Sequence, residues 1–187
     1  MITIRPVQPT DWKHVEDLFG PSGADDGCWC MWWRLTKDAF ADHQGDANRN
    51  ALRTLVVDEE EPGLLAFDNG TTVGWVATGP VINYPRMHDP DETYAADEPD
   101  AWVINCIYVR PGYRKQGISA MLIDAAARSA FERGANDVYG FPMDPRRPEF
   151  TGRHASHGTL SAFLSAGFLR DGSTVPGHLR VKRSYDI

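Results

Sequence analysis

VRPGYRKQGIS, residues 109–119, links an apolar run to a helical pattern. The preceding run AWVINCIYV (101–109) has the length and composition of a fully buried strand. From Gly117 onward, apolar residues recur on one helical stripe, and Gly134 stands where a C-terminal cap belongs. A helix N-terminus presents unpaired N–H groups and the positive end of its dipole, so it favours an anion. We therefore predict a phosphate site here, with a plain glycine-capped loop as the alternative.

The loop does not match the common nucleotide-binding motifs. Neither G-x-x-x-x-G-K-[ST] nor G-x-G-x-x-G occurs in it, which argues against a nucleoside-triphosphate loop and a dinucleotide fingerprint. Arg114 and Lys115 add positive charge beside Gly117, whose missing side chain lets a ligand approach the backbone. The sequence alone therefore leaves two interpretations open, a phosphate site or a plain glycine-capped loop flanked by exposed basic residues.

The rest of the chain predicts a mixed α/β sheet with helices on both faces, in the order β-α-α-α-β-β-β-α-β-α-β. The Asn69-Gly70 step is typical of a hairpin turn. We expect loops over 81–100 and 142–157. The expected strands are 2–7, 64–67, 71–78, 101–109, 137–141 and 180–185. The expected helices are 10–19, two stretches capped by Thr36 and Asp46, one beginning at Gly117, and 159–166.

Length and charge limit the function. The 187 residues suit a single domain, 1–187, and the net charge is −7. No run of basic residues is longer than two, so we expect no nucleic-acid partner. No apolar window reaches membrane-spanning length, so we expect no membrane partner. Three cysteines cannot all pair, and Cys28-Trp29-Cys30 would close only a small strained ring, so we expect reduced thiols and a cytoplasmic location.

Two stretches of the sequence resemble a known family. The pattern V-x-P-x-x-R-x-x-G-I-S after an apolar strand, at Val109–Ser119, is similar to the acetyl-CoA-binding core of the GNAT superfamily of N-acetyltransferases. A second piece, FLSAGF at 163–168, resembles the late helix of that family, which ends in Gly-Phe. The resemblance implies one GNAT-like domain with a mostly antiparallel central sheet. It also implies acetyl-CoA as co-substrate and no metal.

The resemblance also implies where acetyl-CoA would bind. Its pantetheine arm would lie along the strand edge formed by Ile107, Tyr108 and Val109, pairing like an added strand. A backbone N–H of that strand would stabilise the oxyanion. The pyrophosphate would lie on the amides of Arg114, Lys115, Gln116, Gly117, Ile118 and Ser119.

Two positions depart from the family pattern. Where many members have a glutamate base, this chain has Asn105, and where many have an acidic tyrosine it has Phe163. Acyl transfer to an amine still requires a group that takes up the ammonium proton. We predict Asn105, holding a water or the substrate, and His157 as the catalytic residues. His154, Thr159 and Tyr108 are further candidates, and an exposed loop is the alternative for both histidines.

The segment CWCMWWR, residues 28–34, holds half of the six tryptophans. Placed by the resemblance, it would line the acceptor side, so we predict Trp29, Trp33 and Arg34 as substrate-binding residues, with plain helical or strand core as the alternative. A metal site would need His14 or His43 beside Cys28 and Cys30, and the sequence offers no second cysteine pair for it. We expect Cys106 to fill the core rather than carry an acyl group.

Residues 89–100 carry six acidic side chains and no basic one. A solvated loop is one interpretation, and the other is a lid that attracts a cationic amine, with Asp97, Glu98 or Asp100 as base. Together these observations favour transfer of an acetyl group to the primary amine of a small molecule, by direct attack in a ternary complex. The alternatives are an acyl-CoA sensor without catalysis and a protein N-acetyltransferase. A homodimer is possible.

Overall fold

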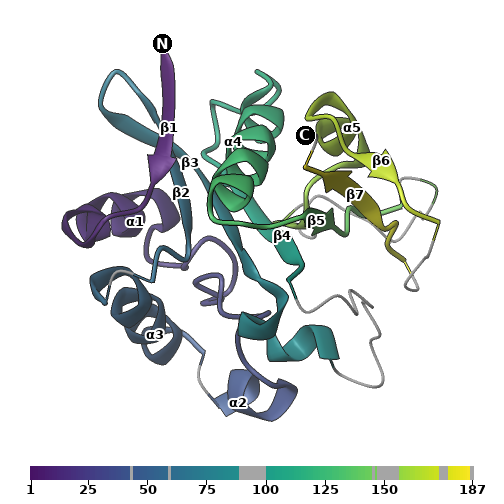
Figure 1. The fold of residues 1–187 in the computed structure, drawn as a ribbon. Helices are drawn as coiled ribbons and strands as arrows, with labels where there is room; N and C mark the ends of the chain where they lie inside the picture. The colour runs from purple at the N-terminus through teal and green to yellow at the C-terminus, as the bar shows by residue number, and fades with distance from the viewer. Residues whose placement is uncertain are drawn as a thin grey trace.

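The sheet is the central element of the computed structural model, which describes residues 1–42, 44–58, 60–88, 100–144, 146, 156–172 and 177–185. The strands stand in the order β1-β2-β3-β4-β5-β7-β6, and neighbours are antiparallel except for the parallel pair β4 and β5 (Figure 1). This confirms the predicted mixed, mostly antiparallel sheet. The strands are β1 (Ile2–Pro6), β2 (Gly63–Asp68), β3 (Thr71–Pro80), β4 (Trp102–Val109), β5 (Asp137–Gly140), β6 (Leu169–Arg170) and β7 (Val181–Ser184).

Helices cover both faces of the sheet because successive strand residues point to opposite sides. Leu64 and Ala66 of β2 pack into the cluster that contains α4, whereas Leu65 and Phe67 pack into the cluster under α1 and α3. The helices are α1 (Trp12–Phe19), α2 (Lys37–Asp42), α3 (Asp46–Val57), α4 (Ile118–Glu132) and α5 (Leu160–Ser165). Short 3-10 turns are η1 (Pro9–Asp11), η2 (Val81–Asn83) and η3 (Pro85–His88).

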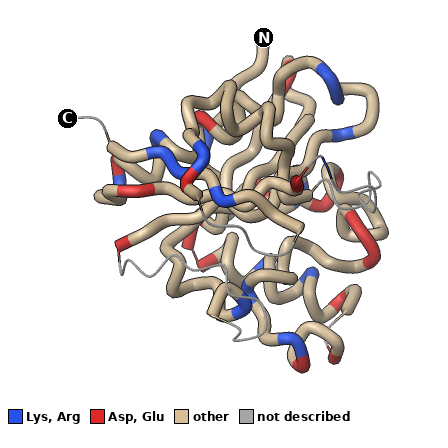
Figure 2. Tube along the Cα trace, turned by 90° about the vertical axis from the view of Figure 1, so that its right-hand side faces the viewer, with Lys and Arg blue, Asp and Glu red and all other residues tan. Residues whose placement is uncertain are grey.

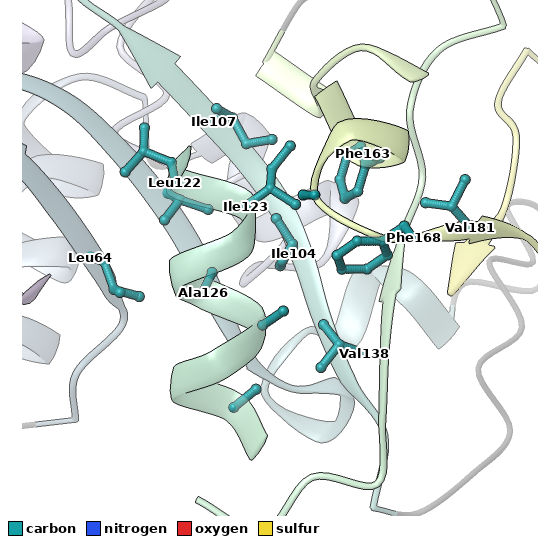
Figure 3. Close-up of a cluster of buried hydrophobic side chains, with 14 of the residues drawn as sticks. Leu64, Ile104, Ile107, Leu122, Ile123, Ala126, Val138, Phe163, Phe168 and Val181 are labelled. Carbon is teal, nitrogen blue, oxygen red and sulfur yellow. The ribbon is translucent and has the colours of Figure 1, made fainter. Parts of the chain in front are cut away.

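Helix α4 forms the centre of the larger core. Its apolar stripe, with Leu122, Ile123 and Ala126 fully buried, lies across β4 and meets Ile104 and Ile107 (Figure 3). Beside β4, the rings of Phe163 and Phe168 meet edge to face and close the same cluster (Figure 3). The loop before α4 is therefore held firmly between a buried strand and a buried helix.

A third cluster lies at the beginning of β4. It joins the segment after Met31 to the turns η2 and η3 and to the end of β5. Its buried members are Trp33, Val81, Tyr84, Met87, Ala101, Val103, Tyr139 and Phe141.

Local details differ from the sequence expectations at four places, and one of them is that Gly45 rather than Asp46 is the N-cap of α3. The first helix is not capped by Thr10, because Pro9 opens a 3-10 turn and the Asp11 carboxylate accepts the N–H of Gln8 at 2.8 Å. The two-residue strand β6 was not predicted, because both its residues are exposed and give no apolar pattern. Residues 28–35 form turns rather than a helix or strand, with the Met31 N–H bonded to the Cys28 carbonyl at 2.9 Å.

The Asn69-Gly70 prediction is confirmed, since both residues have positive φ angles, 47° and 84°, as a tight hairpin turn between β2 and β3 requires. No helix within the described ranges is long and apolar enough to cross a membrane.

Candidate functional site

The two central parallel strands separate along their length. β4 pairs with β3 from Trp102 to Val109, but it pairs with β5 only through Trp102, Val103 and Ile104. Within the described residues, 105–109 therefore have no strand partner on the β5 side. A free strand edge inside a sheet can accept an extended chain through its main-chain groups.

Asn105 lies where the strands begin to separate. Ala77 pairs with Cys106 and Thr78 with Ile104, so Asn105 is an extra residue without a partner in β3. Such a bulge re-aims a side chain. The Asn105 side chain is buried, and neither its amide nitrogen nor its oxygen makes a hydrogen bond within the described part of the chain. A buried carboxamide without partners is costly, which makes Asn105 a candidate for holding a substrate or water.

A tyrosine lies beside this bulge. Tyr84, from the turn between η2 and η3, is fully buried, and its hydroxyl oxygen accepts a hydrogen bond from Arg34 Nη2 at 3.1 Å. The Arg34 guanidinium carbon also lies 4.6 Å from the centroid of the Tyr84 ring. Burial raises the pKa of the Tyr84 phenol, while the Arg34 charge lowers it and offsets part of that rise. The phenol therefore keeps its proton at neutral pH.

His157 comes to the open edge of β4 through its neighbour Gly158. A Cβ on Gly158, whose φ is +76°, would lie 2.6 Å from Ile107 Cδ1, so only glycine allows this close approach to β4. The His157 ring lies 5.1 Å from the Trp33 ring and 4.7 Å from the His178 ring, between centroids. The predicted residues His157 and Trp33 are thus in contact, and His178 joins them.

The loop between β4 and α4 is open to a ligand. Gly117 has a left-handed backbone with φ +78°, and no side chain caps the N-terminus of α4. A Cβ on Gly117 would meet no protein atom within 4 Å. Arg114 Nε donates to the Val109 carbonyl at 3.1 Å, which ties the loop back to the end of β4. The backbone at Gly117 is therefore open to a ligand, beside two exposed basic side chains, Arg114 and Lys115.

The other residues predicted for this loop differ in exposure. Gln116 is exposed and its side-chain amide donates to the Gly112 carbonyl at 3.1 Å, whereas Ser119 is half-buried. The Ile118 side chain is buried in the core, so only its backbone is available to a ligand. Over the described residues, acidic and basic residues are interspersed along the backbone trace (Figure 2).

The predicted acceptor residues are not all brought together. Trp29 packs between Trp12 and Phe19, at centroid distances of 6.0 Å and 5.7 Å, in the cluster under α1 and α3. Trp33 belongs instead to the cluster at the beginning of β4, together with the Arg34-bonded Tyr84. Core packing, which was the alternative for this segment, therefore accounts for Trp29, while Trp33 and Arg34 stay near the open edge.

Phe163 has no polar function. Its ring is fully buried against Gly140 and Gly158, and it cannot donate a proton. Tyr108 is half-buried with its ring edge to face with Phe19, on the α1 side of the sheet. Sequence reasoning missed Tyr84 and His178, and the aperiodic segments that hold them give no signal that could have found them.

Some predicted residues lie outside the described ranges, namely His43, His154, Asp97 and Glu98. Among the described residues, no group of three or more His, Cys, Asp or Glu side chains is arranged to hold a metal ion. His14, one of the ligands considered for a metal, lies 3.1 Å from the Thr72 hydroxyl through its Nδ1.

Comparison with known proteins gives a consistent result. Residues 29–145 match the model of the acetyltransferase (GNAT) family. No curated protein sequence matches the chain. Many solved structures share the fold. One is the PaiA N-acetyltransferase from Thermoplasma acidophilum in complex with coenzyme A, with 14% identity, TM-score 0.58 and 99% of each chain covered.

Two further similar structures are of acetyltransferases that are named after different acceptors. An aminoglycoside acetyltransferase in complex with coenzyme A and kanamycin is 18% identical, with TM-score 0.58, 98% of this chain and 95% of that chain covered. The ribosomal-protein-alanine N-acetyltransferase from Brucella melitensis is 16% identical, with TM-score 0.57, 98% of this chain and 99% of that chain covered. At these identities the likeness concerns the fold alone.

Proposed function

Because the chain belongs to the acetyltransferase (GNAT) family, we propose that it transfers an acetyl group from acetyl-CoA to the primary amine of a small molecule. The whole of 1–187 would act as one domain, since its sheet uses strands from residue 2 to residue 184. The cytoplasm is the proposed location because a reducing compartment suits its free thiols.

The observation that carries this proposal is the combination of an unpaired strand edge and an uncapped helix N-terminus. The pantetheine arm has amide groups, and these can pair with the main chain of Ile107, Tyr108 and Val109, which lack a β5 partner. The phosphates suit the amides that follow Gly117, where a side chain would find open space. The residues present therefore fit acetyl-CoA.

The bound thioester would supply the activated acyl group. The chain would contribute groups near the bulge of β4. The Asn105 carboxamide has unused donors and an acceptor, which suits it to hold a water or the amine. The imidazole of His157, beside Trp33, would take up the proton, either directly or through that water. The protonated phenol of Tyr84 lies next to Asn105 and would keep the bulge polar.

A small acceptor is favoured because the groups around the bulge are buried. Trp33 and Tyr84 are almost fully covered, and Phe141 closes the same cluster. Aromatic side chains gathered beside a few polar groups are typical of small-molecule sites. A protein acceptor would instead need an open surface that admits a peptide.

The test is thiol release from acetyl-CoA in the presence of a panel of primary amines. Aminoglycosides, polyamines and amino sugars would be compared with a peptide that begins with alanine. We expect acetylated product with at least one small amine, and a slower rate for Asn105→Ala. Acetylation of the peptide alone would overturn the small-molecule proposal. Binding of acetyl-CoA without turnover of any acceptor would favour the sensor alternative.

A further inference from the structure

Two cysteines that are far apart in sequence meet in the core. Cys30 Sγ lies 2.6 Å from Cys106 Sγ, although the residues are 76 positions apart. Both are buried free thiols. This separation lies between the covalent bond of a disulfide, about 2.05 Å, and an ordinary nonbonded contact. Little motion would be needed to join the two sulfurs.

The backbone brings Cys30 to this position. Trp29 and Cys30 both have positive φ angles, 47° and 56°, which bulky residues rarely adopt. The turns around them bury Cys30 against the sheet, in the cluster that also holds Trp75 and Cys106. A strained backbone of this kind persists only where the surrounding structure holds it, and it often marks a functional position.

Cys106 has an equally defined place. It pairs with Ala77 across the sheet and directly follows the bulge residue Asn105. A covalent bond from Cys106 to Cys30 would tie the segment that carries Trp33 to the strand proposed to bind acetyl-CoA. Neither the family match nor the proposed function assigns a role to this pair.

We propose that Cys30 and Cys106 form a redox-modification site, which a two-electron oxidant such as hydrogen peroxide converts into an intramolecular disulfide. One sulfur, after losing its proton, attacks a peroxide oxygen, the O–O bond breaks, and a sulfenic acid and one water result. The second sulfur then attacks the sulfenic sulfur, the S–S bond forms, the S–O bond breaks, and its proton leaves in a second water. Two thiols are oxidised and one peroxide is reduced to two waters. A dithiol reductant reverses the change.

The chemistry of the thiols sets the expected rate. Burial raises the pKa of the Cys30 thiol, and the adjacent Cys106 raises it further. The thiolate is the reactive form, so oxidation should be slow at neutral pH and faster at higher pH. The third cysteine, Cys28, is less buried, and burial raises its pKa to about 11. Cys28 therefore competes with Cys30 for the bond to Cys106, and the test must separate these two pairings.

The test uses the full chain, folded and treated with hydrogen peroxide or with dithiothreitol, then alkylated in denaturant and counted for free thiols. We expect three free thiols in the reduced protein and one in the oxidised protein, with peptides 14–34 and 87–114 linked after trypsin digestion. Because Cys28 and Cys30 share a tryptic peptide, Cys28→Ser identifies the partner and should keep the cross-link. Cys30→Ser should lose the cross-link. If that variant does not fold, Cys106→Ala takes its place and should lose the cross-link as well.

A second measurement compares the melting temperatures of oxidised and reduced Cys28→Ser. A bond closing so long a loop should raise the melting temperature by about 4–16 °C. A cross-link that requires Cys28, disulfides only between molecules, or sulfinic acid without a cross-link would each overturn the proposal. So would a lower melting temperature in the oxidised form. None of these results depends on acetyl transfer, so failure here leaves the proposed function untouched.

Discussion

Replacing Asn105 with leucine should make the protein more stable and less active. The side chain is 3% exposed, and both polar atoms of its amide lack hydrogen bonds within the described residues. An unsatisfied buried polar group costs about 1–3 kcal/mol, and leucine has a similar shape without that cost. For a chain of this length the gain corresponds to a rise of about 2–12 °C in melting temperature.

Activity should change in the opposite direction. If the Asn105 amide holds the water or amine at the bulge of β4, its loss removes the path for the proton, and turnover should fall by about 10²-fold. The assays are thermal unfolding without ligand and thiol release with the best amine from the panel. A buried polar group that lowers stability and supports activity is the usual compromise of a functional site.

Thr78 supplies the matched control. Its hydroxyl is also buried and without a hydrogen bond among the described residues, and it lies on β3 opposite Ile104, the residue before Asn105. Thr78→Val should therefore raise the melting temperature as well, but leave turnover within about twofold of the wild type. Asn105→Leu protein that is less stable than the wild type, or that turns over normally, would refute the reasoning.

Three further substitutions test the packing and charge of the fold. Gly140→Ala should lower the free energy of unfolding by about 1–3 kcal/mol, because its Cβ would stand 2.2 Å from a ring carbon of buried Phe163. In urea unfolding, the double variant Gly140→Ala, Phe163→Leu should recover part of the lost free energy. If the effects of the two substitutions on the free energy of unfolding simply add, the contact is contradicted. Asp11→Asn should cost about 1–3 kcal/mol at pH 7, since Arg5 donates to the Asp11 carboxylate at 2.5 Å and 2.8 Å. Arg5 lowers the pKa of Asp11, so this stabilisation is complete above the unfolded pKa of about 3.9 and is lost as the pH falls through the folded value. The difference in unfolding free energy between wild type and Asp11→Asn should therefore become smaller at acid pH. A difference that stays constant between pH 7 and pH 2 would contradict the ion pair.

The strand–loop–helix unit was predictable because each part has a local signal. The buried run of β4, the apolar stripe of α4 and the positions of Gly117 and Gly134 follow from periodicity and cap chemistry, which act over a few residues. That residue 163 cannot donate a proton was likewise visible, because it depends only on the residue type.

Contacts between distant segments were not predictable in this way. Tyr84 lies in an aperiodic stretch, and only the folded chain brings it to Arg34. The contact of Cys30 with Cys106 depends on left-handed backbone angles that favour glycine, in a segment that has none at those positions. The same turns send Trp29 and Trp33 into different clusters, which the spacing of the tryptophans does not indicate.

The central claim is that acetyl-CoA binds at the N-terminus of α4, and the most direct measurement is thermal unfolding with and without excess acetyl-CoA. Ligand at about 100 times its Kd should add about 2.7 kcal/mol, or about 5–11 °C. Gly117→Ala is compared with Gly134→Ala at the other end of α4, since both have positive φ and open space for a Cβ. The account predicts a large shift for the wild type and Gly134→Ala, and a much smaller one for Gly117→Ala. No shift in folded wild-type protein, or equal shifts in both variants, would contradict it.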